Sequence, residues 1–303
     1  MSNQSMRFKI YGIRGSYPPT AGFPTHFGVN TTCFRFDVGP HVVVLDAGTG
    51  IINLGADLLK EAREQNGSQN PWRMFIFFTH LHIDHLMGFP YLPQIYFPQS
   101  EIHLISPKIV NYSLADALEM LMSPALFPVT LDELQSTRIY HDFAENRVAY
   151  FTEEGVHILP SLNKKGVDKW ILKVSAIRNY THPKGGAYVY KFETPAGNSV
   201  VIATDVEGFI GGDQRIINFA KGASILVHDA QYTLPEYAMF QGFGHSTYEM
   251  ACHVAKEAGV QKLLLFHHDP KHDDAVLSEL EAAAQKIFPE TYMAAESMEF
   301  TLK

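Results

Sequence analysis

Residues 75–88 read Phe-Ile-Phe-Phe-Thr-His-Leu-His-Ile-Asp-His-Leu-Met-Gly, and this stretch decides the fold. Its apolar start predicts a strand that is covered on both faces, because such strands show a continuous apolar run. Four possible metal ligands follow at the predicted strand end: His80, His82, Asp84 and His85. Alternate residues of an extended chain point the same way, so His80 and His82 can converge on one ion, and Asp84 and His85 can turn towards a second. Imidazole and carboxylate are ligands that divalent metals such as zinc accept, so the stretch predicts a metal site.

Three later apolar runs also end in histidine or aspartate. Residues 200–205 end at Asp205, residues 225–230 contain His-Asp-Ala, and residues 263–269 end in His-His-Asp. In open α/β sheets, ligands collect beyond the carboxyl ends of the strands. We therefore expect these strand ends to share one site with residues 80–85.

The rest of the chain alternates between strand and helix patterns. Two features stand out: a hairpin at residues 33–38 and 41–45, and a Leu- and Met-rich run at residues 118–127. We interpret that run as core, with a lid or a dimer contact over the site as the alternative. Further strands are expected at residues 7–13, 101–106, 171–177, 187–193 and 292–302, and helices at about 46–65, 107–136, 247–258 and 273–287.

The composition of the chain limits which kinds of protein it can be. The chain has 303 residues, 46% of them hydrophobic, and no break in composition, which predicts one domain over residues 1–303 with a partly helical insertion at about 107–170. The formal charge is 24 − 32 = −8, so no overall positive field would recruit nucleic acid. Cys33 and Cys252 are the only cysteines, which suits a reducing compartment. Without a secretory signal or a membrane-length apolar run, we expect a cytoplasmic protein with no membrane partner.

The pattern His-x-His-x-Asp-His at residues 80–85 resembles the metallo-β-lactamase superfamily. This resemblance implies an α/β fold, the four-layer αβ/βα sandwich, with a metal site at the edge of two facing mixed sheets. Further motifs resemble the ribonuclease Z-like and cyclic-nucleotide-phosphodiesterase-like subgroup. They are Gly-Ile-Arg-Gly-Ser at 12–16, Asn-Thr-Thr-Cys at 30–33, Asp-Ala-Gly-Thr-Gly at 46–50, Ala-Thr-Asp at 203–205, Gly-His-Ser-Thr at 244–247 and Phe-His-His-Asp-Pro at 266–270.

The resemblance also implies a ligand set for two divalent ions. Zinc is the expected metal, and manganese or iron would also be accommodated. His267 is preferred to His268 because it is the first residue after the apolar strand. Asp46 either supports the metal site from behind a ligand or caps the following helix, and the two roles are compatible. The implied ligands are His80, His82 and His182 for the first ion, Asp84, His85 and His267 for the second, and Asp205 as the bridge between them.

Two such ions could share a water and hold it as a bridging hydroxide, and their charge suits an anionic phosphodiester. In ribonuclease Z-like proteins the histidine of Gly-His-Ser-Thr assists the cleavage, and an acid orients it. The resemblance implies His245 and Asp229 for these roles, since His228-Asp229-Ala230 stands where those proteins have His-Glu-Ala. A carboxylate on one ring nitrogen would fix the tautomer and make His245 a better proton donor. A capping or packing role for His245 is the alternative. We predict Asp84, His245 and Asp229 as the catalytic residues of a phosphodiesterase for a small-molecule substrate such as a cyclic nucleotide.

Three other functions share this scaffold. A tRNA 3′-end endonuclease is the second candidate, although a basic Gly/Pro-rich arm is missing and His268-Asp269-Pro270 replaces the Ser-x-Arg-Tyr pattern. Because phosphate contacts need Lys and Arg, the acidic balance also makes a nucleic-acid partner less expected. A lactone or ester hydrolase would use the same ligands, and a metal-binding sensor would be the non-enzyme alternative. The resemblance also implies a homodimer.

Overall fold

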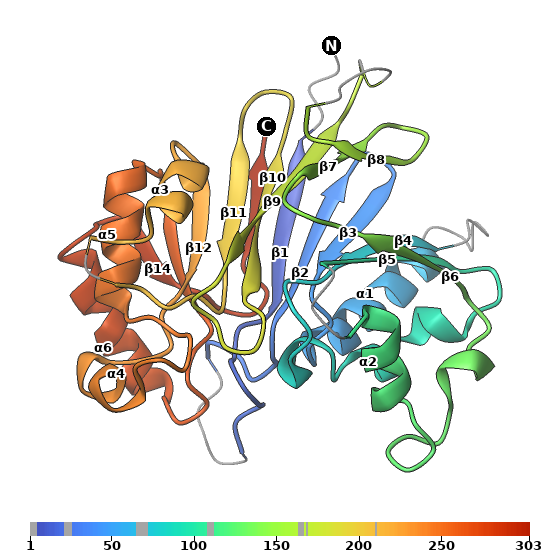
Figure 1. Cartoon of the computed structure of the whole chain (residues 1–303), viewed down its shortest axis with the longest axis horizontal. Coiled ribbons are helices and arrows are strands. Elements are labelled where there is room, and N and C mark those ends of the chain that lie inside the picture. The colour runs from blue at the N-terminus through green and yellow to red at the C-terminus, as the bar shows by residue number, and fades with distance from the viewer. Residues whose placement is uncertain are drawn as a thin grey trace.

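The computed structural model describes residues 5–20, 26–64, 72–107, 112–162, 167, 169–209 and 211–303. Two sheets face each other at the centre of the molecule, and helices flank their outer faces (Figure 1). This is the four-layer αβ/βα sandwich that the resemblance implies, so the predicted fold class is confirmed. None of the helices in the described part of the chain is long and apolar enough to cross a membrane.

The first sheet contains seven strands among the described residues. Its half from β3 to β6 is parallel, so the carboxyl ends of these strands reach one edge. The order across the sheet is β15 (Glu299–Leu302), β1 (Met6–Gly12), β2 (Cys33–Val38), β3 (His41–Leu45), β4 (Arg73–Phe77), β5 (Glu101–Ser106) and β6 (Thr137–Asp142).

The second sheet contains eight strands among the described residues. Its strands from β11 to β14 are parallel, which brings their carboxyl ends to one edge as well. The order is β14 (Thr291–Met293), β13 (Leu263–Phe266), β12 (Ile225–Asp229), β11 (Ser199–Ala203), β10 (Ala187–Glu193), β9 (Leu172–Asn179), β7 (Arg147–Phe151) and β8 (Val156–Pro160).

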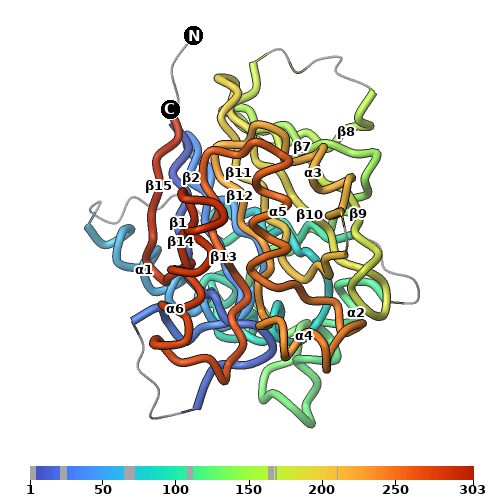
Figure 2. The backbone as a smooth tube through the Cα atoms, turned by 90° about the vertical axis from the view of Figure 1, so that its left-hand side faces the viewer, coloured from blue at the N-terminus to red at the C-terminus, as the bar shows by residue number. Residues whose placement is uncertain are grey.

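The helices divide between the two outer faces. On the side of the first sheet lie α1 (Gly50–Glu64) and α2 (Leu114–Leu121) (Figure 1). The helices on the side of the second sheet stand in front of it in Figure 2; they are α3 (Gln214–Ala220), α4 (Leu234–Phe240), α5 (Tyr248–Ala258) and α6 (Asp274–Gln285).

Aromatic side chains fill the space between the sheets. Phe36 of β2 stacks on Phe192 of β10 with ring centroids 3.8 Å apart, and Phe34 of β2 meets Phe266 of β13 at 4.7 Å. Large stacked rings bury much apolar area and hold the two sheets at a fixed separation. This packing therefore also holds in place the edge at which both sets of parallel strands end.

Strand β4 is covered on both faces, as its continuous apolar run predicts. Phe75 and Phe77 belong to the core between the sheets, whereas Met74 and Ile76 belong to the core beneath α1. All four side chains are buried. The predicted metal-binding motif at residues 80–85 therefore follows directly after a strand that is held by packing on both faces.

The strand predicted over residues 292–302 is wrong as one element. It is two short strands in different sheets: β14 pairs with β13 in the second sheet, and β15 pairs with β1 in the first. The chain crosses between the sheets at Glu296, whose carboxylate accepts the backbone N–H groups of Val29 and Asn30 at 2.7 and 2.6 Å. A crossover held by distant backbone groups leaves no periodic signal in the sequence.

The helix predicted over residues 107–136 is also wrong in extent. Among the described residues of that span, α2 is the only α-helix, followed by a single 3₁₀ turn at Leu131–Glu133. Ser113 starts α2 with a capping box, and the chain turns before Pro124, because proline disfavours helix at the preceding residue. The rest of the predicted insertion at about 107–170 contributes β6 to the first sheet and β7 and β8 to the second.

Candidate metal centre

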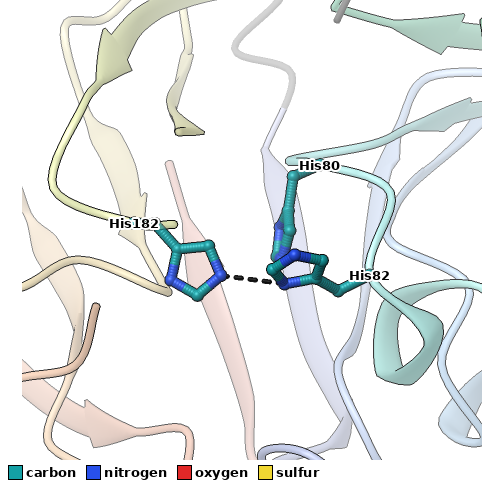
Figure 3. A group of neighbouring side chains, drawn as sticks. All are labelled: His80, His82 and His182. Atoms are coloured by element: carbon teal, nitrogen blue, oxygen red, sulfur yellow. Dashed lines mark hydrogen bonds between the residues drawn. The ribbon is translucent and has the colours of Figure 1, made fainter. Parts of the chain in front are cut away.

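Three histidines form the first cluster (Figure 3). His80 and His82 lie in the loop after β4, and His182 comes from the connection between β9 and β10 on the facing sheet. The Nε2 atom of His182 lies 2.9 Å from the Nδ1 atom of His82. One ring nitrogen from each of the three residues lies within 4.8 Å of the others. Two sheets thus contribute to one possible metal position.

The second cluster contains Asp84, His85, Asp205 and His267, all buried, with one possible ligand atom from each within 4.8 Å of the others. His267 Nε2 lies 3.4 Å from Asp84 Oδ2 and 3.3 Å from Asp205 Oδ1. The same Asp205 Oδ1 lies 3.7 Å from His182 Nε2 in the first cluster. Asp205 therefore stands between the two clusters, where a bridging carboxylate would be needed.

The structure brings all seven predicted ligands together, although their assignment to individual ions stays a prediction. It also separates the two neighbouring histidines after β13. His267 points into the second cluster, whereas His268 is buried elsewhere, with its Nε2 atom 2.9 Å from the backbone oxygen of Ala294. The residue immediately after the apolar strand is thus the one at the site.

These residues fit a pair of divalent metal ions. The Nε2 atoms of His80, His85 and His267 are buried and have no hydrogen-bond partner among the residues that the structure describes. A buried polar atom that makes no hydrogen bond costs about 1–3 kcal/mol, so a metal ion bound between these nitrogens and the nearby Asp205 carboxylate would satisfy all of them. Imidazole nitrogen with carboxylate oxygen is a donor set that suits zinc and related metals.

The opposite ring nitrogens are held by other groups. His85 Nδ1 lies 2.8 Å from Asp46 Oδ2, and His267 Nδ1 lies 2.8 Å from Gln231 Oε1. Such contacts orient a metal-binding imidazole and fix which nitrogen carries the proton. The predicted support of the site by Asp46 is therefore observed. Its carboxylate also accepts the backbone N–H and the hydroxyl of Thr79, both at 2.8 Å.

The charge state of the histidines differs between the clusters. Burial lowers the pKa of His80 well below its usual value, with a further contribution from His85, and burial lowers the pKa of His182 to about 4. Both rings are neutral near pH 7, the state that binds a metal. For His267 burial acts in the same direction, but the charges of Asp205 and Asp84 outweigh it and raise the pKa to about 9. An ion entering the second cluster therefore displaces a proton.

Backbone strain gathers at the same edge. Among the described residues, six that are not glycine have a positive φ, and five of these line or support the site. Non-glycine residues in this region cost of the order of 1–3 kcal/mol each and persist where the surroundings hold them. The five are Ser16 (61°), Asp46 (62°), Lys184 (61°), Asp205 (55°) and His267 (63°).

Three contributors were missed in the sequence: Ser16, Gly15 and Gln231. The backbone N–H of Ser16 donates to Asp84 Oδ2 at 2.8 Å, and Gly15 lets the chain pass directly against His267. Both belong to the motif at residues 12–16, to which no role was assigned; its pair of glycines was the available signal. Gln231, which holds His267, lies two residues after Asp229 and carried no signal of its own.

Replacing Gly15 by alanine is expected to loosen the second metal position. A Cβ there would lie 2.4 Å from the Nδ1 and Cε1 atoms of His267, so the imidazole or the loop must move. Because contacts behind a ligand are worth about 10–100-fold in metal affinity, we expect a loss of that size for one of two ions, measured by titration with a competing chelator. Gly155→Ala is the control, since its Cβ meets only the flexible Arg73 side chain at 3.3 Å. Unchanged affinity for both ions in Gly15→Ala would contradict this role.

The predicted catalytic pair lies beside both clusters. His245 Nδ1 is 2.8 Å from Asp229 Oδ2, and the other oxygen of Asp229 accepts the backbone N–H of Ser246 at 2.8 Å. The ring of His245 lies 4.8 Å from that of His267 and 5.2 Å from that of His182, centroid to centroid. The capping role falls to Thr247, whose side chain accepts from the backbone at the start of α5. His245 is thus free to offer Nε2 to the site.

A cleft of about 290 Å³ opens over these groups, which we call the metal cleft. It is lined by ligands of both clusters together with His245. The two remaining lining residues are Ser16 and Ile83. A small anionic group can therefore reach both clusters and His245 at the same time.

Comparison with known proteins agrees with this site. The family model described as "Beta-lactamase superfamily domain" matches residues 41–268. A ribonuclease Z from Thermoplasma acidophilum is 28% identical in an alignment of 325 residues that covers 99% of this chain and 97% of that protein. That span includes every residue of both clusters.

Solved structures show the same fold. The metallo-β-lactamase fold protein YhfI from Bacillus subtilis superposes with a TM-score of 0.65 at 17% identity, covering 99% of this chain and 100% of that one. A diphosphatase from the PhnP family gives 0.62 at 16% identity, covering 98% of each chain. Since the family model matches well over half of the chain, this protein belongs to the metallo-β-lactamase superfamily, in its ribonuclease Z-like subgroup, as a metal-dependent hydrolase.

Proposed function

We propose that this protein is a phosphodiesterase that hydrolyses a small phosphodiester. The observation that carries the proposal is the hydrogen-bonded pair of His245 and Asp229 beside the two His/Asp clusters. A lactone or ester hydrolase would need only the metal ligands. Hydrolysis of a phosphodiester is accelerated further by a group that donates a proton to the leaving oxygen.

Two zinc ions are the proposed cofactors, held by the seven predicted ligands, with Asp205 shared between them. When bound, such ions lower the pKa of a common water and place positive charge beside the phosphoryl oxygens. Manganese or iron would suit the same nitrogen and oxygen donors.

The chain's own residues orient the substrate and supply the proton. His245 donates a proton from Nε2 to the leaving oxygen, while Asp229 keeps the proton on Nδ1 and fixes the plane of the ring. Burial opposes the charged form of Asp84, but the neighbouring His85 and His267 outweigh it and hold the pKa of this carboxyl well below its usual value. The backbone N–H of Ser16 donates to its Oδ2 atom and orients it. The metal cleft, at about 290 Å³, has room for one phosphoryl group and part of its substituents.

A tRNA 3′-end endonuclease is the second candidate, favoured by the name of the relative that is 28% identical over nearly the full chain. The lack of basic side chains among the described residues of the metal cleft and the negative charge of the whole chain argue against this function. None of the described residues that line the metal cleft is Lys or Arg, and the net charge is −8. Binding a large polyanion depends on many basic contacts. The homodimer and the cytoplasmic location stay predictions.

A substrate panel on protein of measured metal content tests the proposal. We expect metal-dependent turnover of bis(p-nitrophenyl) phosphate and of at least one small natural diester, with little activity on lactones or precursor tRNA. Turnover of precursor tRNA without small diesters would favour the endonuclease. Activity on lactones alone would favour the ester hydrolase, and no turnover by fully loaded protein would favour the sensor.

A further inference from the structure

A second and larger cleft adjoins the metal cleft. Its volume is about 660 Å³, within the range of small-molecule pockets, and we call it the apolar cleft. One wall is Leu81 and Ile83 in the loop after β4, and the other is Met120, Leu121 and Leu126 on α2 and the turn that follows. The second wall belongs to the Leu- and Met-rich run, which we interpreted as core, with a lid or a dimer contact as the alternative.

Some side chains of the run belong to the core and others are exposed; the lid and the dimer contact stay predictions. Leu118 and Met122 are fully buried in the core beneath α1, on the outer face of the first sheet. Met120 and Leu126 are 60% and 70% exposed, and across the cleft Ile83 is 54% exposed. Large apolar side chains that face solvent together around a cleft indicate a binding surface, because single domains otherwise keep such groups scattered.

The two clefts are continuous. His82 and Ile83 line both of them, so a substrate with its phosphoryl group over the clusters can extend across Ile83 into the apolar cleft. His245 lines only the metal cleft. The leaving oxygen, which takes its proton from His245, therefore lies away from the apolar cleft. The group in the apolar cleft is the one that stays on phosphorus.

A single positive charge stands at this cleft. Lys184 is the sole Lys or Arg among the described residues that line either cleft, and its side chain is exposed. Its backbone has a φ of 61°, next but one to His182, and such strain persists where the surroundings fix it. A lysine among the residues that line the apolar cleft suits a substrate with a negative phosphodiester group.

We propose that the apolar cleft binds the non-leaving substituent of the substrate and that this substituent is an aryl or branched alkyl group. The inference rests on the proposed phosphodiesterase function and narrows its substrate class. A nucleobase fits less well, because most side chains that line the cleft are apolar and would offer no hydrogen bonds to its polar edge. The specificity-determining residues are thus Met120 and Leu126.

A series of diesters with one leaving group tests the proposal. Methyl, isobutyl, phenyl and 1-naphthyl p-nitrophenyl phosphate all release p-nitrophenolate and differ only in the group that stays on phosphorus. We expect kcat/KM, divided by the rate of hydroxide hydrolysis of each ester, to rise about 10- to 100-fold from methyl to phenyl or naphthyl, because a ring of that size becomes buried.

The variants Met120→Ser and Leu126→Ser test whether the preference for aryl esters comes from the apolar cleft. Both side chains are mostly exposed, so the fold should tolerate the change, and the phenyl-to-methyl ratio should fall towards one. Leu162→Ser is the matched control, because Leu162 is 99% exposed and lies outside both clefts, and it should keep the ratio of the native protein. Equal corrected kcat/KM for methyl and aryl esters would overturn the inference and leave the phosphodiesterase standing. No turnover of any ester by metal-loaded protein would overturn the phosphodiesterase itself.

Discussion

Replacing His245 by alanine is expected to lower kcat on small phosphodiesters by about 10²–10⁴-fold, the usual worth of a positioned proton donor. The physical reason is the geometry of the pair: Asp229 Oδ2 holds Nδ1 at 2.8 Å, which leaves Nε2 for the leaving oxygen. Metal content should stay the same, because the variant keeps all seven predicted ligands. The measurement is kcat together with metal content on the same sample.

The leaving group offers a sharper readout of the same variant. An ester of a good leaving group such as p-nitrophenolate needs little protonation, so it should lose less activity in His245→Ala than an alkyl ester does. His253→Ala on α5 is the matched control, since His253 is exposed and not among the residues that line the metal cleft. Full activity of His245→Ala on an alkyl ester at full metal loading would exclude His245 as the donor.

Replacing Asp205 by asparagine is expected to remove at least one ion and to lower kcat by about 10²–10³-fold or more. Asp205 lies 3.3 Å from His267 Nε2 and 3.7 Å from the Nε2 atoms of His80 and His182, so one carboxylate serves both clusters. Asparagine keeps the shape but lacks the charge that balances two cations. Metal content after dialysis and kcat with excess metal are the measurements.

Asp269→Asn is the matched control for Asp205→Asn. Asp269 is a carboxylate at the same edge, but its Oδ1 atom accepts the backbone N–H of Lys271 and it belongs to neither cluster. It should keep both ions. An Asp205→Asn protein that binds two ions with native affinity would show that this carboxylate is no bridge.

The sequence predicts the centre of the molecule well because that centre is made of buried strands. A strand such as β4, covered on both faces, shows a continuous apolar run, and the polar residues that follow it stand out. The same contrast marks Asp205, Asp229 and His267 at the ends of β11, β12 and β13. Parallel pairing then brings these ends together without any further information.

What could not be predicted depends on contacts between distant segments. Gly15 approaches His267 so closely that a Cβ would lie 2.4 Å from the ring, and Gln231 holds that same ring, but neither contact has a local pattern. The apolar cleft was missed for a related reason. Met120 and Leu126 resemble their buried neighbours Leu118 and Met122 in composition, and only the position of α2 shows which of them face solvent.

The central claim is that two metal ions occupy the two clusters. Its most direct measurement is anomalous diffraction from crystals of protein loaded with zinc, with the metal content of the same preparation determined by elemental analysis. The account predicts two ions per chain, one among His80, His82 and His182 and the other among Asp84, His85 and His267, with Asp205 contacting both. Fully loaded protein with one ion, or with ions bound away from these residues, would contradict it.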